Sequence, residues 1–212
     1  MTADAQTPLR ADARRNRDQI IAAARAIFAE HGPEIAMEEI ARTAGVGVGT
    51  LYRRFPDRDS LIRAVAVDSF QRVLDDAKAA ARDEPTAWQA LVRLLYQSAE
   101  LQLSVQLAMQ SQRALATLKQ HPVVLALRDE LLAEVDRMVR GAQEEGNLRP
   151  DVDTGDIAQL LSVRLRAPRM KTPEIARMAA DRSIAIMIDG LRATPGTPLP
   201  WRPLTTEDLV GS

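Results

Sequence analysis

The feature that most constrains this fold is a glycine-rich turn between two short helical stretches. The turn reads Gly45-Val46-Gly47-Val48-Gly49, and residues 37–44 and 48–55 flank and overlap it. A glycine just past a helix end suits the left-handed backbone conformation, in which other residues clash at Cβ. Leu51 and Phe55 lie four residues apart, so they share one helix face and are expected to point inward. The segment therefore predicts a helix-turn-helix.

The second of these helices combines a small start with many hydrogen-bond donors. Gly47 and Gly49 let the backbone approach a surface closely, and Thr50, Tyr52 and Arg53 supply donors. This combination is typical of a helix that reads the major groove of DNA. The formal net charge of the chain is −1, so any basic surface for DNA must be local.

The rest of the chain also favours helices. Aromatic residues make up only 3%, while Ala, Leu, Arg, Glu and Asp are frequent. Apolar spacing predicts an all-α fold of about nine helices. Three short helices within residues 14–55 precede a long connecting helix over 57–82 and a larger helical bundle that extends to 193, with one stretch of it reaching 118. Residues 1–13 and the proline-rich tail are expected to be irregular.

Several classes of function are disfavoured by the residues. The chain contains no cysteine, which excludes disulfides, thiolate catalysis and cysteine-ligated zinc. His31 and His121 lack a metal-binding spacing, and no nucleophile arrangement or phosphate-binding glycine loop is found. No apolar run approaches membrane-spanning length, and the N-terminus has no secretory pattern. We expect a cytoplasmic protein that is not an enzyme, with no cofactor, metal or membrane contact.

A denser pattern covers residues 14–70. It consists of Ile20-Ile21-Ala22-Ala23-Ala24, Ala26-Ile27-Phe28, Gly32, Ile40-Ala41, Ala44-Gly45-Val46 and Thr50-Leu51-Tyr52-Arg53-Arg54-Phe55-Pro56. In this pattern the chain resembles the TetR family of bacterial transcriptional regulators. The resemblance implies a homodimer, a third helix that reads a palindromic operator in double-stranded DNA, and a ligand pocket in the C-terminal bundle.

We accordingly divide the chain into an arm and DNA-binding domain (1–56), an effector and dimerisation domain (57–193) and a C-terminal tail (194–212). One residue departs from the family pattern. Ala36 stands where relatives often have Ser or Thr to cap the second helix, and the missing cap costs about 1 kcal/mol. Glu38 and Glu39 partly compensate through the helix dipole, and we expect them to face away from DNA.

The candidates for DNA contact are hydroxyl, guanidinium and small side chains: Arg14, Arg42, Val48, Gly49, Thr50, Tyr52, Arg53 and Arg58. Arg58 resembles the basic residue with which relatives touch the DNA backbone beside the motif. Other interpretations remain open. The Tyr52 ring could simply pack on the first helix, Gly49 could serve turn geometry alone, and Arg14 could belong to a solvated helix start.

Two further sets of candidates lie in the C-terminal bundle. The effector pocket is predicted to involve Phe70, Trp88, Tyr96 and Met109, and the dimer interface Leu160, Leu161, Ile184, Met187, Ile188 and Leu191. The pocket residues could equally be ordinary core. The basic cluster Arg164, Arg166, Arg169 and Lys171 is either an anion site or a set of paired surface charges.

These observations favour a ligand-responsive DNA-binding regulator, most simply a repressor that a small molecule releases from its operator. Scarce aromatic and acidic residues predict a largely apolar, neutral or weakly anionic effector. The alternative is an all-α ligand-binding or scaffold protein with weak or lost DNA binding, which Ala36 and the near-zero net charge would suit.

Overall fold

The computed structural model describes residues 6–31, 34–97, 121–164, 172–193 and 197–209. Within these ranges it contains eight α-helices, a short 3-10 helix and no β-strand, which confirms the all-α prediction. The helices are α1 (Gln6–His31), α2 (Met37–Thr43), α3 (Val48–Arg54), α4 (Arg58–Asp83), α5 (Ala87–Gln97), α8 (Pro122–Glu144), α9 (Thr154–Arg164), α10 (Pro173–Leu191) and the 3-10 helix η1 (Glu207–Leu209). The helical stretch expected to reach Leu118 lies outside the described residues.

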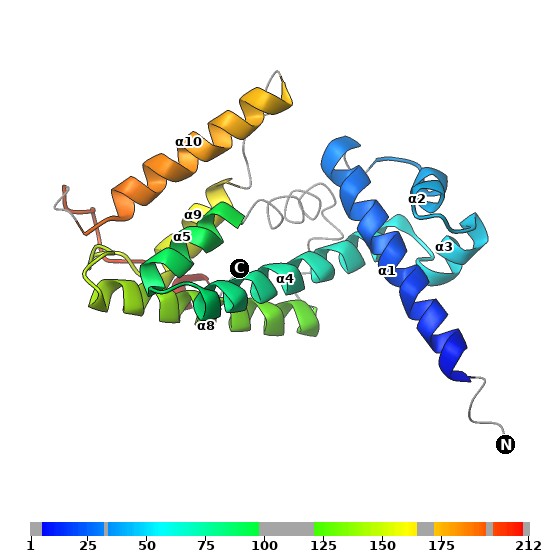
Figure 1. Cartoon of the computed structure of the whole chain (residues 1–212), viewed down its shortest axis with the longest axis horizontal. Helices are drawn as coiled ribbons and strands as arrows, with labels where there is room; N and C mark the ends of the chain where they lie inside the picture. The colour runs from blue at the N-terminus through cyan, green and yellow to red at the C-terminus, as the bar shows by residue number, and fades with distance from the viewer. Residues whose placement is uncertain (1–5, 32–33, 98–120, 165–171, 194–196, 210–212) are drawn as a thin grey trace. The chain divides into compact units, whose positions relative to one another are not determined.

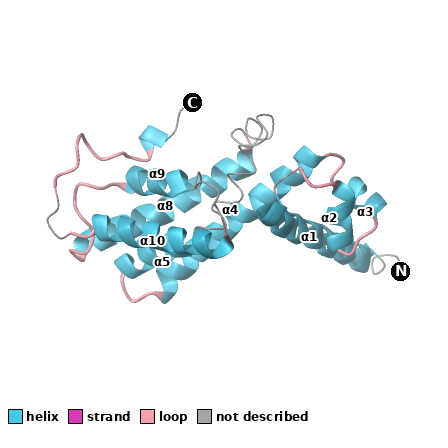
Figure 2. Cartoon of the chain, turned by 90° about the horizontal axis from the view of Figure 1, so that it is seen from above, coloured by secondary structure: helices cyan, strands magenta, loops and turns pink. Residues whose placement is uncertain are grey.

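Contacts divide the chain into two compact units. The first comprises α1, α2, α3 and α4 up to Ser69, together with residues 121–124 (Figure 1). The second comprises α4 from Phe70 onwards, most of α8, the helices α5, α9 and α10, and η1 (Figure 2). Helix α4 therefore contributes residues to both units.

The first unit is built around one apolar cluster. Its members are buried and come from all four helices: Ile20, Ala24 and Phe28 of α1, Ile40 and Ala41 of α2, Leu51 of α3 with the adjoining Phe55, and Leu61 and Val65 of α4. The predicted inward faces of α1, α2 and α3 are thus confirmed. Gly45 has φ +67°, the left-handed conformation predicted for it, and the following Val46 N–H donates to the carbonyl of Ala41 at 3.0 Å.

Most helix starts carry the expected side-chain caps. Asp57 Oδ1 accepts from the Ser60 N–H at 2.6 Å, and Thr86 Oγ1 accepts from the Gln89 N–H at 3.1 Å. Ala36 makes no side-chain cap bond to α2, as its sequence predicts. Helix α1 begins at Gln6 and not near residue 14, so the expectation that the whole of 1–13 is irregular is wrong. The first N–H groups of a helix have no intrahelical partner, so a proline near the start of α1 loses no bond.

Helix α5 has a second cap that comes from a distant part of the chain. The Glu145 carboxylate, just past the end of α8, accepts from the N–H groups of Ala87 at 2.7 Å and Trp88 at 3.1 Å. Desolvation by burial acts to raise the pKa of Glu145, but these two bonds and one from the Asn147 side chain lower it below the ordinary value. Glu145 thereby ties the end of α8 to the start of α5.

We predict that Glu145→Gln lowers the free energy of unfolding by up to about 1 kcal/mol at neutral pH, because a neutral amide is a weaker acceptor at a partly exposed helix start. The folded-state pKa of Glu145 lies below the ordinary 4.5, so its contribution is fully present above that pH and is lost as pH falls through the folded-state value. The stability gap between wild type and variant should therefore close in acid.

Urea titrations at pH 7 and pH 3 measure this gap. Glu144→Gln is the matched control, because it makes the same charge change at an exposed neighbouring position. Equal losses in the two variants, or a gap that persists at pH 3, would contradict the assignment.

Candidate nucleic-acid interface

The outer face of α3 presents the predicted DNA-contacting side chains. Leu51 and Phe55 hold its inner face against the core, which leaves Val48, Gly49, Tyr52 and Arg53 exposed. A Cβ placed on Gly49 would meet no atom within 4 Å, so the backbone here is open to a close approach. Thr50, on the same helix, is half-buried. The start of α3 is therefore small and accessible, with donors one turn further along.

Tyr52 is engaged with an acidic residue of α2. Its hydroxyl donates to Glu38 Oε1 at 3.2 Å, and 41% of the residue remains exposed. Desolvation by burial, and then the Glu38 charge, raise the pKa of Tyr52, while the Arg58 charge lowers it. The expectation that Glu38 faces away from this surface is wrong, because the carboxylate reaches across the turn to the Tyr52 hydroxyl. Sequence spacing could not show this contact, since the two residues lie fourteen positions apart.

The predicted basic residues lie on several helices of the first unit. Arg42 of α2 is exposed and pairs with Glu39 at 3.2 Å. Arg14 of α1 and Arg53 of α3 are exposed, and Arg58, which opens α4, is half-buried. Exposed ion pairs contribute 1 kcal/mol or less, so the guanidinium of Arg42 can exchange Glu39 for a phosphate at little cost. Hydroxyl and guanidinium donors beside an open helix start are the groups that bind phosphate oxygens.

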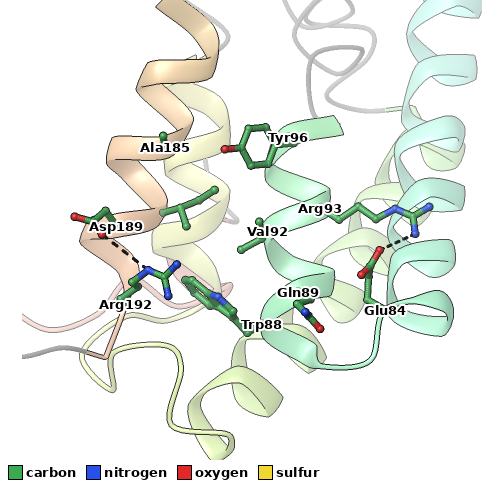
Figure 3. Close-up of a pocket in the computed structure, with 10 residues that line it drawn as sticks. Glu84, Trp88, Gln89, Val92, Arg93, Tyr96, Ala185, Asp189 and Arg192 are labelled. Atoms are coloured by element: carbon green, nitrogen blue, oxygen red, sulfur yellow. Dashed lines mark hydrogen bonds and ion pairs between the residues drawn. The ribbon is translucent and has the colours of Figure 1, made fainter.

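A groove in the second unit brings together two of the predicted effector residues. Trp88 and Tyr96 of α5 line it with Val92 of the same helix and Ile188 of α10, and it encloses about 480 Å³ (Figure 3). Phe70 is half-buried on α4 and does not line it, and Met109 lies outside the described residues. The floor is apolar, as expected for an effector site.

The rim of this groove is charged, which the sequence did not indicate. The Arg192 guanidinium carbon lies 5.6 Å from the centre of the Trp88 ring, a cation–π distance. Arg192 also pairs with Asp189 at 3.9 Å, and Arg93 pairs with Glu84 at 3.0 Å (Figure 3). The groove can therefore receive a flat apolar group and offer it a cation.

The predicted dimer residues differ in their exposure. Ile184, Ile188 and Leu191 are buried within the chain itself, while Leu160 and Met187 are half-buried. The exposed apolar side chains of α10 are instead Ile175, Met178 and Ile186. The side chains of Leu161 and Arg164, and the residues Arg166, Arg169 and Lys171, are outside the described part of the chain. No helix in the described ranges is long and apolar enough to cross a membrane.

Comparisons with known proteins agree with this geometry. Residues 20–65 match the family described as bacterial regulatory proteins, tetR family, and residues 84–193 match the C-terminal domain described as transcriptional regulator SbtR-like. The chain is 38% identical over 76 residues to an HTH-type transcriptional regulator of Staphylococcus aureus strain USA300, a match that covers 32% of this chain. The chain spans 41% of the length of that curated relative.

Solved structures match over most of their length. The TetR transcriptional regulator SCO0520 of Streptomyces coelicolor is 28% identical with a TM-score of 0.67, over 84% of this chain and 99% of that one. A TetR transcription regulatory protein of Mycobacterium vanbaalenii is 31% identical with a TM-score of 0.62, over 87% and 99%. The helix-turn-helix, the all-α architecture and these matches together show that the chain belongs to the TetR family of bacterial transcriptional regulators.

Proposed function

We propose that the protein is a ligand-responsive transcriptional regulator that acts in the cytoplasm, in the simplest case a repressor that leaves its operator when a small molecule binds. The observation that carries the proposal is the outer face of α3, where Val48, Tyr52 and Arg53 surround the open backbone of Gly49. We assign DNA binding to residues 1–56 and dimerisation and effector binding to residues 57–193, with 194–212 as a tail.

On this proposal α3 enters the major groove by its N-terminal end. The Val48 methyls suit a thymine methyl, and Gly49 allows the backbone close to base edges. Thr50 and Tyr52 hydroxyls bond phosphates or bases, and the guanidinium groups of Arg14, Arg42, Arg53 and Arg58 bind the phosphate backbone. Contacts of the second kind position the protein and depend strongly on salt.

The regulatory step requires two subunits. A two-fold dimer presents two recognition helices to half-sites about 34–36 Å apart, so a palindromic operator mirrors the symmetry of the protein. A ligand that binds one dimer arrangement better than another shifts the population toward it. Helix α4 is the natural lever, since it supplies Leu61 to the core of the first unit and continues through the second to Asp83.

The groove of the second unit supports an effector class. Trp88 and Tyr96 provide aromatic surface, and Arg192 stands over Trp88 while already sharing Asp189. A flat, largely apolar molecule that is neutral or carries one anionic group fits these residues. A polycation would have to displace both arginines from the carboxylates they now neutralise.

The alternative function, a ligand-binding or scaffold protein with weak DNA binding, draws support from two residues. Ala36 leaves the start of α2 uncapped, and Glu38 places a carboxylate on the hydroxyl that would bind phosphate. A titration with the DNA upstream of its own gene separates the two functions.

We predict that Tyr52→Phe weakens operator binding by about two- to tenfold, because it removes one hydroxyl bond of roughly 0.5–1.5 kcal/mol. Tyr52→Ala should weaken it further, since the ring contact is also lost. Neither change should unfold the first unit, whose core is formed by other side chains. Fluorescence anisotropy gives the affinity and circular dichroism the fold, and an unchanged affinity with an intact spectrum would refute the role of Tyr52.

A second prediction concerns Glu38. Glu38→Gln should strengthen DNA binding severalfold, because it removes a negative charge beside the phosphates and frees the Tyr52 hydroxyl. Glu39→Gln is the matched control, with the same charge change on the same helix but next to Arg42. The gain from Glu38→Gln should shrink in a Tyr52→Phe background, whereas the effect of Glu39→Gln should not change. A gain that is equal in both backgrounds would show that Glu38 does not act through Tyr52.

A third prediction concerns the effector. A ligand at one hundred times its dissociation constant stabilises the protein by roughly 2.7 kcal/mol, so thermal shift can screen a compound panel. Flat apolar monoanions should raise the melting temperature, and Arg192→Gln should reduce their affinity more than that of neutral analogues. Arg182→Gln, at an exposed position on the same helix, should leave both unchanged. If only polycations raise the melting temperature and release DNA, the proposed effector class is wrong.

A further inference from the structure

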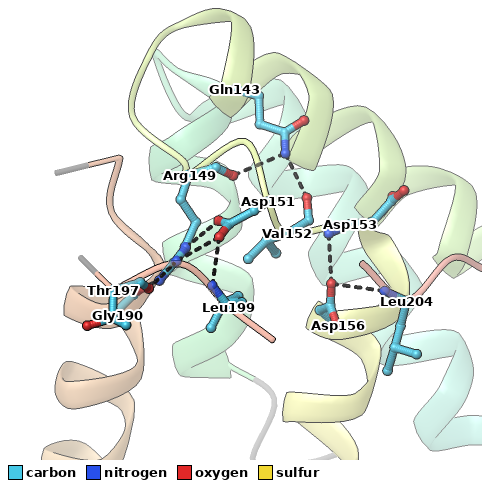
Figure 4. Close-up of polar contacts among 10 residues, drawn as sticks. All are labelled: Gln143, Arg149, Asp151, Val152, Asp153, Asp156, Gly190, Thr197, Leu199 and Leu204. Carbon is cyan, nitrogen blue, oxygen red and sulfur yellow. Dashed lines mark hydrogen bonds and ion pairs between the residues drawn. The ribbon is translucent and has the colours of Figure 1, made fainter. Parts of the chain in front are cut away.

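The C-terminal tail, residues 197–209, is strapped across the start of α9. The Leu199 N–H donates to Asp151 Oδ2 at 3.1 Å, and the Leu204 N–H donates to Asp156 Oδ2 at 3.2 Å (Figure 4). Arg149 donates to the carbonyl of Thr197 at 3.0 Å and pairs with Asp151, which holds the pKa of Asp151 below its usual range. Both carboxylates thus bind backbone N–H groups of the tail.

The chain around this strap is shaped to receive it. Gly155, in the first turn of α9, lies directly against the carbonyl of Leu204, and a Cβ at that position would overlap the tail backbone. Further along, Asp208 accepts two bonds from Arg202, each of 2.7 Å, and one from the Thr205 N–H at 2.9 Å. The strap is therefore a specific, fixed conformation.

This fixed conformation presents one large apolar side chain to solvent. Trp201 lies between Pro200 and Pro203, its backbone has φ +67°, and 95% of the residue is exposed. The left-handed conformation is strained for a bulky residue, and such strain marks positions where function determines geometry. An indole held in water by a strained backbone has its apolar area available for burial elsewhere.

Beside the strap lies an apolar groove between α9 and α10, with a volume of about 430 Å³. Its apolar lining comprises Leu160, Ile186, Met187, Leu191, Leu199 and Leu204. Ile186 is 69% exposed. The Trp201 side chain does not fill the groove of its own chain, because nearly all of it is exposed.

We propose that Trp201 anchors the homodimer by inserting into the α9–α10 groove of the partner subunit. The chain carries both a rigid projection and an apolar groove, and a two-fold axis lets each subunit give one and receive one. A small ligand or an unrelated peptide would occupy the groove and leave Trp201 exposed, whereas a second copy accounts for both. Centrally placed tryptophans are frequent energetic anchors of interfaces. This inference rests on the dimer of the proposed function.

The test uses Trp201 as its own reporter. The chain has two tryptophans, so Trp88→Phe leaves Trp201 as the only one. At concentrations where light scattering gives a dimer, its emission should be blue-shifted and its acrylamide quenching severalfold weaker than after dilution to monomer. Trp201→Phe, which keeps only the buried Trp88, should show no change on dilution.

Sedimentation of single variants in the native background provides a second measurement that does not depend on replacing Trp88. Trp201→Ala should raise the dimer dissociation constant tenfold or more. Gly155→Ala, which displaces the strap although alanine suits a helix better, should weaken the dimer in the same direction. Val123→Ala, at another exposed apolar position, is the control and should leave the constant unchanged.

A dimer in which Trp201 stays freely quenched, or in which Trp201→Ala leaves the constant unchanged, overturns this inference and leaves the dimeric regulator intact. A chain that remains monomeric at micromolar concentration and fails to bind its upstream DNA overturns both. In the expected case, Trp201→Ala binds operator normally once its concentration exceeds the raised dimer constant.

Discussion

The burial of Leu51 and Phe55 determines how the first unit can function. These two side chains fix the inner face of α3, and Gly45 supplies the left-handed residue that lets α3 leave α2 at a tight turn. Once they are buried, the helical period alone places Val48, Tyr52 and Arg53 on the outer face. A core contact of ordinary chemistry thus decides which side chains are presented to a ligand as large as DNA.

The outer face is internally satisfied in the free protein. Tyr52 bonds Glu38, and Arg42 pairs with Glu39, so DNA binding would exchange internal partners for phosphates. Such an exchange gives a small net gain per contact. Affinity would then depend on many simultaneous contacts, and the acidic residues would penalise binding in a poor register. The formal net charge of −1 agrees with this balance, since no general excess of positive charge draws the chain to nucleic acid.

The features that could be predicted from sequence are those encoded within a few neighbouring residues. The left-handed Gly45, the caps of Asp57 and Thr86, the uncapped Ala36 and the inner face of α3 all follow from local spacing. Contacts between distant residues could not be predicted. Glu145 caps a helix almost sixty residues earlier in the chain, and Glu38 reaches Tyr52 across a turn. Apolar periodicity identified the inner face of α10 through Ile184 and Ile188, but it could not say whether the same chain or a partner covers that face. The tail, expected to be irregular, is irregular in secondary structure yet held by specific bonds to Asp151 and Asp156.

The central claim, that the outer face of α3 reads DNA, is tested most directly by titrating the protein with DNA from upstream of its own gene and with a scrambled duplex, at several salt concentrations. The account predicts a dissociation constant of roughly 10⁻⁸ M or tighter for one upstream segment, at least about a thousandfold tighter than for the scrambled duplex, with affinity falling linearly in the logarithm of salt concentration. Equal affinity for both duplexes at every salt concentration, or no binding to either, would contradict it.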